Sequence, residues 1–316
     1  MIKLLNLIQN ENMKIYRRLR TWILGALLIV IVVAVSMLSH SGESTAGPDE
    51  WKKGAAITIE QSKKELTNPE VPEPFKKSLK EGIILQQYAL DHNIPPVQTT
   101  LWGGVQGMAG LVMLVTLFTV IIAGDMVAGE FTWGTIKLLL IRPANRAKIL
   151  FSKYAATLLF AAALLVSLFV TAVIVNGILY GFQNIGAPHL TVNPDGTVHE
   201  GNMLLYVFAT YGYKLIELVM IVTLAFMIST VFRSSSLAIG LSIFIMFAGQ
   251  VITMLVLRYS WGKYFLFANT DLTQYLEGKP LAQGMTMGFS ITVLIFYFLL
   301  FNVLSWEIFR RRDVAA

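Results

Sequence analysis

The chain has 316 residues, of which 55% are hydrophobic and only 14% are charged, and its mean hydropathy is +0.63. Because a soluble domain carries about 25% charged residues, this composition excludes an ordinary water-soluble protein and indicates a membrane protein. The net charge is +6, but the basic residues stand beside apolar runs, which favours anionic lipid over nucleic acid as their partner. The absence of cysteine excludes disulfides and thiolate metal sites.

Residues 1–20 are predicted to form an amphipathic helix that lies in the inner membrane interface. The apolar residues on one face of its helical wheel are Leu4, Leu5, Ile8, Ile15, Tyr16 and Leu19. Lysines and arginines lie elsewhere on the wheel, as is typical of interfacial helices.

Six apolar runs are long enough to cross a membrane as helices, since a span takes about 20 residues. They cover residues 21–38, 104–124, 154–181, 204–232, 237–257 and 287–306. The first run could be a secretory signal, but five later spans and the lack of a small-residue cleavage site favour its retention. We therefore expect an all-α integral membrane protein with one transmembrane domain over residues 1–316.

Orientation follows from the basic residues near the spans, which favour the cytoplasmic side. Fourteen Lys and Arg lie on the side that holds both termini, whereas the short loops on the opposite side hold three. We therefore expect segment 125–153 and the tail 307–316 to be cytoplasmic. Residues 39–103, 182–203 and 258–286 are expected to face outward.

The long outer loop, residues 39–103, is predicted to contain two polar helices, Asp49–Leu66 and Phe75–Asn93. Prolines at positions 69, 72 and 74 separate them. The loop is either a solvated cap or a gate or binding surface for whatever leaves the membrane.

No catalytic signature stands in the sequence: it lacks a nucleophile elbow, a zinc-protease motif and a phosphate-binding loop. His189, Asp195, His199 and Glu200 share one outer loop and could hold a metal. The turn sequence NPDG (193–196) in the middle of this loop favours a solvated hairpin instead.

The fourth span carries Lys214 and Glu217, three residues apart and therefore on one helical face. A structural ion pair is the first interpretation, with Lys214 extending outward and neutralising Glu217. A substrate-contacting or proton-linked role is the alternative, because intramembrane carboxylates are often functional.

The segment from Gly124 to Tyr154 interrupts the apolar spans with seven charged residues. Glu130 and Lys137 offer charge to a partner, and Gly129 and Gly134 permit a bend or a close contact. Pro143 is expected to stop a helix, and Asn145 is expected to cap the next one. The segment is therefore predicted to be a solvated docking surface, at which reversing the charge of Glu130 would cost little folding stability.

Residues 128–154, AGEFTWGTIKLLLIRPANRAKILFSKY, resemble the Glu-x-x-x-Gly-Thr segment, Arg-Pro and basic helix start of the membrane permeases of ATP-binding-cassette exporters of the second class. The stretches NENMKIYRRLRTW (10–22) and SWEIFRRRD (305–313) support the resemblance, which covers essentially the whole chain. The enlarged first outer loop departs from the family pattern and leaves substrate and gating open.

The resemblance implies that segment 125–153 is a coupling helix, which sits in a groove of a separate ATPase subunit. The positions that match the family segment are Glu130, Gly134, Thr135, Arg142, Pro143 and Arg146. ATP and Mg would then bind the partner ATPase, and this chain would hold no cofactor. The working unit would pair two permeases, either identical or paralogous, with two ATPases in a bacterial cytoplasmic membrane. Export of an amphipathic drug, peptide or lipid-like substrate would follow.

Two other classes are weighed against a transporter subunit. A self-sufficient secondary transporter is disfavoured, since neither paired repeats nor broken helices around midplane polar residues are evident. A transport-silent membrane partner that relays ATPase motion to an outer-face protein stays open. An embedded enzyme is disfavoured for want of a catalytic constellation.

The cysteine-free background allows the predicted topology to be tested by labelling single cysteines in intact cells. Asp195→Cys and Ser44→Cys should react with an impermeant maleimide, whereas Asn145→Cys and Ala315→Cys should react only after permeabilisation. Labelling of Asn145→Cys in intact cells would overturn the orientation and with it the docking role of segment 125–153.

Overall fold

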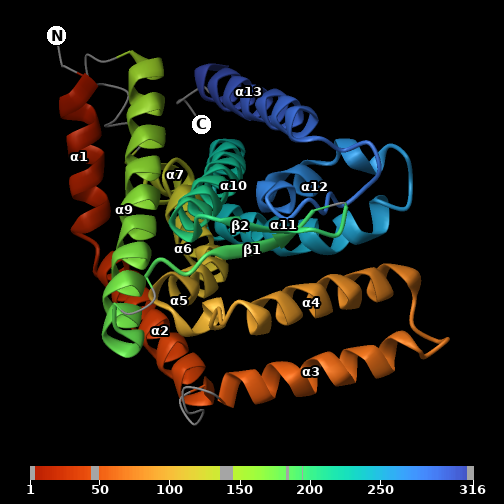
Figure 1. Ribbon diagram of the computed structural model, residues 1–316. Helices are drawn as coiled ribbons and strands as arrows, with labels where there is room; N and C mark the ends of the chain where they lie inside the picture. The colour runs from red at the N-terminus through yellow and green to blue at the C-terminus, as the bar shows by residue number, and fades with distance from the viewer. Residues whose placement is uncertain (1–3, 44–49, 136–144, 183–184, 194, 312–316) are drawn as a thin grey trace. The chain divides into compact units, whose positions relative to one another are not determined.

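Six helices of the computed structural model are long and apolar enough to cross a membrane (Figure 1). The structure describes residues 4–43, 50–135, 145–182, 185–193 and 195–311. The candidate spans are Leu19–Ser41, Leu101–Asp125, Arg146–Tyr180, Met203–Val231, Ser235–Val256 and Met287–Arg311. The prediction of a mainly helical chain with six helices able to cross a membrane is confirmed.

The chain divides into two compact units, each assembled from separated stretches of sequence. The first unit comprises residues 1–30, 110–168 and 211–316, and the second comprises residues 31–109 and 169–210. The candidate functional site lies within the first unit, and a separate pocket lies within the second.

The first unit is built around helix α6 (Val112–Asp125), in which ten of the fourteen residues are buried. Its other helices are α1 (Leu4–Tyr16), the start of α2 (Leu19–Glu43), α7 (Ala128–Thr132), most of α9 (Arg146–Tyr180) and α10 (Met203–Val231), α11 (Ser235–Val256), α12 (Leu266–Thr270) and α13 (Met287–Arg311), with the short 3-10 turns η3 (Gly262–Tyr264) and η4 (Leu272–Tyr275). Helix α6 (Val112–Asp125) packs against α11. A Cβ atom at Gly124 would lie 3.0 Å from Ile239 Cγ1, so glycine permits this close approach.

The second unit contains a pair of helices, α3 (Glu50–Leu66) and α4 (Glu73–Asp91), which lie side by side (Figure 1). They are followed by η1 (Val97–Thr99) and α5 (Leu101–Gly107). Strands β1 (His189–Val192) and β2 (Val198–Gly201) form an antiparallel hairpin that packs against α4. The predicted hairpin at NPDG is confirmed, and Gly196 takes the positive φ of +83° that its turn requires.

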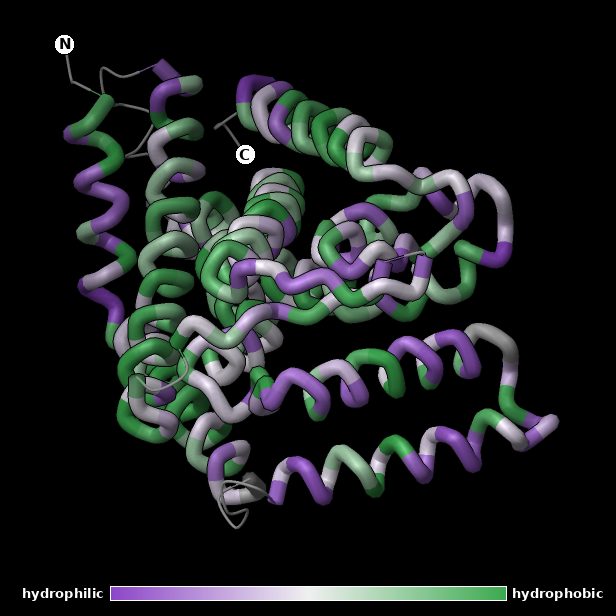
Figure 2. Tube along the Cα trace, viewed as in Figure 1, coloured by the Kyte–Doolittle hydropathy of each residue, from purple (hydrophilic) through white to green (hydrophobic). Residues whose placement is uncertain are grey.

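Figure 2 shows the difference between the membrane helices and the outer helices. Hydrophobic residues run along α2, α9 and α13, whereas α3 and α4 mix hydrophilic and hydrophobic residues along their length. The predicted polar helices at 49–66 and 75–93 are therefore confirmed, with ends that differ by at most two residues.

Several span boundaries differ from those expected, most clearly at α9 and α13. Helix α9 begins at Arg146 rather than at residue 154, and α13 continues to Arg311 rather than ending at 306. Apolar runs mark only the lipid-embedded part of a helix, which can continue beyond the membrane. The second span is α5 and α6 joined by the 3-10 turn η2 (Met108–Leu111), where two glycines, Gly107 and Gly110, disfavour a regular α-helix.

Candidate functional site: a charge cluster beside helix α7

Ser229 of helix α10 holds the short helix α7 in place. Ser229 Oγ of α10 accepts hydrogen bonds from the backbone N–H groups of Val127 and Ala128, at 3.1 and 3.0 Å, and donates to the carbonyl of Gly124 at 2.7 Å. It thus satisfies backbone groups left open where α6 ends and α7 begins. At the other end of α7, the backbone N–H of Ser235 donates to Thr132 Oγ1 at 3.0 Å.

Four charged side chains next to α7 form a closed ring of alternating sign. Lys153 Nζ donates to Glu11 Oε2 at 2.9 Å and to Glu130 Oε1 at 2.7 Å. Lys14 Nζ bonds the same two carboxylates, at 2.8 Å to Glu11 and 3.2 Å to Glu130. The ring therefore joins α1, α7 and α9, and its formal charge sums to zero. We call Glu11, Lys14, Glu130 and Lys153 the ion ring.

Burial makes the ion ring more than a surface contact. The Lys153 side chain is only 2% exposed and that of Glu130 is 13% exposed. A buried ion that loses its partner keeps its desolvation cost, so removing one member of such a pair destabilises a protein by about 3–5 kcal/mol. The ring thus requires all of its members at once.

The protonation states follow from this geometry. Burial opposes ionisation of Glu130, but the Lys153 ammonium and the hydrogen bonds from Lys153 and Thr135 lower its pKa to about 2. Burial likewise opposes ionisation of Glu11, and Lys153 and Lys14 lower its pKa. The pKa of Lys14 is raised by Glu11 and Glu130 against the effect of burial.

A second group of ions lies beside the ring. Asp125, at the end of α6, accepts hydrogen bonds from Arg18, Arg20 and Ser235. Both groups line one cavity of about 860 Å³, whose walls also include Trp133 and Thr135. Two arginines against one carboxylate leave this side of the cavity with a net positive charge.

The chemistry available here is electrostatic positioning rather than bond making. No group of three or more His, Asp or Glu that could hold a metal occurs among the residues the structure describes. The lysines and glutamates of the ring are committed to one another. What the arrangement can do is fix the position of α7 relative to α1 and α9.

The expectation that Glu130 projects into solvent is wrong. Its carboxylate faces inward because its partner Lys153 is buried on the inner side of α9. Reversing the charge of Glu130 would therefore disrupt the fold, and Glu130→Arg does not report on docking. Sequence reasoning missed Glu11 and Asp125 as partners altogether.

The other predicted docking residues are placed as follows. Thr135 donates to the Glu130 carboxylate, and Gly134 has a φ of +68°, which confirms the bend expected there. Arg146 begins α9 and donates to the carbonyl of Arg310 at 2.9 Å. Asn145 Oδ1 accepts from the backbone N–H of Ala147 at 3.1 Å, which confirms the predicted cap. Lys137, Arg142 and Pro143 lie outside the described residues.

A residue not singled out from the sequence provides the exposed surface of this region. Trp133, directly after α7, is 75% exposed although tryptophan is usually well covered. Indole side chains are enriched among the residues that dominate binding energy at protein interfaces. Trp133 is therefore the side chain of this region best suited to contact a partner.

The predicted pair Lys214–Glu217 is present, with Lys214 Nζ 2.9 Å from Glu217 Oε2. Lys214 also bonds Asp271 Oδ2 at 2.9 Å, from the loop after α12. Lys214 thus links α10 to that loop, which supports a structural role, although one lysine now serves two carboxylates. The proposed proton-linked role stays a prediction.

The histidine loop forms the β1–β2 hairpin without gathering its polar residues. The ring of His189 stacks on Tyr206 at 3.7 Å between centroids, and Glu200 accepts a hydrogen bond from Tyr88 at 3.0 Å. Asp195 accepts from Thr197 within the turn. These contacts assign His189, Asp195 and Glu200 to the packing and turn of the hairpin, and His199 pairs with Thr191 across its two strands.

Comparison with known proteins gives a family match and two relatives. A family model described as "Protein of unknown function (DUF2705)" matches residues 77–315. "Uncharacterized protein YhcI" of Bacillus subtilis (strain 168) is 42% identical over 315 residues, covering 99% of this chain and 100% of the relative. "Uncharacterized membrane protein YdbK" of the same organism is 31% identical over 205 residues, covering 64% and 78% of the two chains. Together with the six apolar helices, these matches identify a multi-pass membrane protein.

The depressed pKa of Glu130 predicts an acid-sensitive fold. Because the folded pKa of about 2 lies below the ordinary value of 4.5, the ionised carboxylate stabilises the fold above about pH 4.5. That contribution is lost as the pH falls toward 2, and on the order of 2 kcal/mol should disappear between pH 6 and pH 3. Glu130→Gln should remove this part of the pH dependence of the unfolding free energy, measured by denaturant titration in detergent.

The matched control is Glu65→Gln, at an exposed position of α3. It should unfold with the same pH dependence as the parent. If Glu130→Gln and the parent lose stability equally between pH 6 and pH 3, Glu130 is not part of a buried ion ring.

Proposed function

The chain belongs to the DUF2705 family, and from its architecture and the α7 region we propose that it is the permease subunit of an ATP-binding-cassette exporter. In this proposal ATP and Mg bind a separate ATPase subunit, and the permease passes the motion of that subunit to its spans. The substrate class proposed is an amphipathic drug, peptide or lipid-like molecule.

The observation that best supports the proposal is that Trp133 is exposed directly after a helix whose position is fixed. The indole is exposed, yet the helix before it is fixed by Ser229 and by the ion ring. An element that transmits force needs an exposed contact on a rigid support, because a mobile support would absorb the displacement. A one-turn helix held by α1, α9, α10 and α11 meets that requirement.

The ion ring also indicates how a push at α7 would reach the membrane. Glu130 of α7 is bonded through Lys153 to α9 and, through both lysines, to α1. Displacement of α7 would therefore move α1 and α9 with it, or break the ring at the cost of a buried unpaired charge. This linkage is the proposed route from ATP-driven closure to repacking of the spans.

A second permease copy, or a paralogous permease, is proposed to complete the working unit. Long apolar helices such as α11 and α13 leave most of their spans uncovered within this chain. Lipid can cover part of that surface, and a second permease is proposed to cover the rest. We further propose a bacterial cytoplasmic membrane, with both termini and α7 on the cytoplasmic side.

The alternative is a transport-silent partner that relays ATPase motion to a protein on the outer face. The large helical module of α3 and α4 favours it, since a simple pore would not need such an element. The two functions share the docking of an ATPase at α7 and differ only in what moves on the outer side.

Truncating Trp133 tests the docking role without touching the ion ring. Trp133→Ala should leave membrane expression and the unfolding free energy within about 0.5 kcal/mol of the parent, because the indole is exposed. It should reduce co-purification of the ATPase at least tenfold, since aromatic interface anchors contribute about 2 kcal/mol or more. The measurement is quantitative mass spectrometry of the complex purified from its native host.

Trp261→Ala is the matched control, at an indole that is 57% exposed and predicted to face outward. It should retain the ATPase. Equal recovery of the ATPase with Trp133→Ala and Trp261→Ala would contradict docking at α7.

A further inference from the structure

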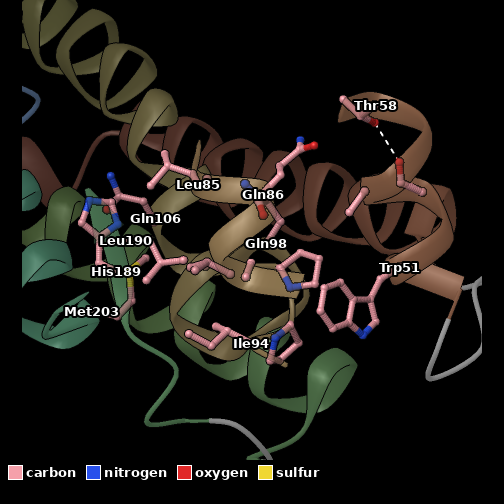
Figure 3. A pocket seen from close by; sticks show the side chains of 18 of the residues that line it. Trp51, Thr58, Leu85, Gln86, Ile94, Gln98, Gln106, His189, Leu190 and Met203 are labelled. Atoms are coloured by element: carbon pink, nitrogen blue, oxygen red, sulfur yellow. Dashed lines mark hydrogen bonds between the residues drawn. The ribbon is translucent and has the colours of Figure 1, made fainter. Parts of the chain in front are cut away.

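The pocket of the second unit and the cavity beside the ion ring differ in the chemistry of their walls. The pocket, of about 650 Å³, lies among α3, α4, residues 94–98, α5 and β1 (Figure 3). In Figure 3, Trp51 stands at one end of it and His189 and Met203 stand at the other, and most of the described residues in its wall are apolar. The cavity of the first unit, of about 860 Å³, is instead lined by charged side chains. It therefore offers a ligand charges to bind, which an apolar wall does not.

The charges of this cavity do not cancel among the described residues of its wall. The ion ring sums to zero, so the remaining charges are those of Arg18, Arg20 and Asp125. Both arginines donate to the same atom, Asp125 Oδ2, which holds two guanidinium groups side by side against one carboxylate. One positive charge is left over, and two like charges held this close repel each other. A single negative charge placed beside both arginines would remove the excess and offset the repulsion.

The two guanidinium groups are within reach of a ligand. Both line the cavity, and the side chains of Arg18 and Arg20 are 43% and 37% exposed, whereas that of Asp125 is 4% exposed. A guanidinium group carries five N–H donors, and Asp125 accepts from one nitrogen of each, so further donors remain on both side chains. The planar fork of arginine fits the oxygens of a phosphate group, to which it can donate two parallel hydrogen bonds. The pair therefore suits a phosphate that enters from the cavity.

The arginines stand where a membrane-crossing α2 meets the lipid headgroups. The candidate span begins at Leu19, so Arg18 directly precedes it and Arg20 lies in its first turn. Leu19 lines the cavity and shares one face of α2 with Trp22 and Ile23, which follow it at i+3 and i+4. All three are exposed apolar side chains. A phosphate at the arginines would thus have an exposed apolar surface directly beside it, as a phospholipid requires.

From these observations we propose that Arg18 and Arg20 bind the phosphodiester of an anionic phospholipid, whose acyl chain lies along the exposed face of α2 that begins at Leu19. The single negative charge of phosphatidylglycerol matches the excess charge of the cavity. A zwitterionic lipid carries the same phosphodiester but also brings an ammonium group, for which no unpaired carboxylate remains among the described wall residues. Free phosphate is also an anion but lacks the acyl chain. This site goes beyond the proposed docking of an ATPase and needs no ATPase to form.

Titration of the full chain in detergent with short-chain lipids tests this site. The chain is purified without any ATPase and kept at about 0.5 M salt, where diffuse attraction between charges is screened over a few ångströms. Bound lipid is counted by native mass spectrometry. We expect saturable binding of one dioctanoyl phosphatidylglycerol. Dioctanoyl phosphatidylcholine should bind roughly tenfold more weakly, and so should glycerophosphoglycerol and inorganic phosphate, which have no acyl chain to bury.

Arginine variants with a matched control separate the site from the general basic charge of the region. Arg18→Gln and Arg20→Gln should each lower the affinity for phosphatidylglycerol roughly tenfold, since each removes a charged donor. Arg17→Gln removes the same charge from an exposed neighbour outside the cavity wall and should bind like the parent. Each glutamine variant leaves Asp125 one arginine, and its unfolding free energy in lipid-free detergent shows whether the fold is kept. Should a glutamine variant unfold, Arg18→Lys decides: it keeps the charge beside Asp125 but lacks the planar fork, and it should lose about threefold in affinity.

Several results would overturn the proposal. Equal affinity of the parent and all four arginine variants would mean that Arg18 and Arg20 bind no lipid. Binding of inorganic phosphate as strong as that of phosphatidylglycerol would identify a free-phosphate site, and equal binding of phosphatidylcholine would contradict the match of charge. Loss of the ATPase from Arg18→Gln in its native host, with lipid binding unchanged, would assign the arginines to a partner protein instead. Trp133→Ala tests ATPase docking separately, so the two proposals can fail independently.

Discussion

The proposed docking region around helix α7 depends on Lys153. Its ammonium group is fully buried in the first unit and bonds one carboxylate from α1 and another from α7. A lysine in such a place is tolerated only because Glu11 and Glu130 are both there to replace its hydration. Glu11 and Glu130 in turn need the two lysines, because a buried carboxylate without a positive partner is also costly. Helices α1, α7 and α9 are thereby fixed against one another.

This arrangement changes how the charges around α7 are understood. A segment rich in charge looks like a surface made for a partner, yet the charges of Glu130 and Lys153 are turned inward and neutralise each other. The surface that remains for a partner is aromatic, at Trp133. Binding energy at protein interfaces is concentrated in such anchors, whereas exposed charge pairs contribute little. The charged residues of the ion ring therefore fix the position of α7, and the aromatic Trp133 makes the proposed contact with the partner.

Much of the fold could be predicted because membrane insertion leaves a strong signal in the sequence. Six apolar runs identified the spans, and the prolines between 66 and 75 separated α3 from α4. The ends of α9 and α13 could not be placed, because polar residues continue a helix beyond the lipid without interrupting its backbone bonds. The 3-10 turn in the second span was signalled only by glycines, which many membrane helices contain without such a break.

The ion ring was hidden for a different reason. Buried charges pair through the tertiary fold, so composition and spacing do not show which carboxylate meets which lysine. A local signal did exist: Glu11 stands four residues from both Leu7 and Ile15, and all three are buried on one face of α1. Lys153 similarly occupies the buried stripe of α9 that includes Ile149 and Phe160. A charged residue within an apolar stripe predicts a buried ionic partner, although not its identity. The pocket of the second unit depends on contacts between β1, α4 and α5 and left no such trace.

We propose that the buried ion ring supports the surface to which an ATPase subunit docks. Its most direct test is Lys153→Met, measured both for unfolding free energy and for ATPase co-purification, beside Lys148→Met at an exposed position of the same helix. Lys153→Met should lose about 3–5 kcal/mol of stability and also lose the ATPase, although its side chain is out of reach of any partner. Lys148→Met should stay within about 0.5 kcal/mol of the parent. A Lys153→Met protein that is as stable as the parent and still retains the ATPase would show that the ion ring does not support docking.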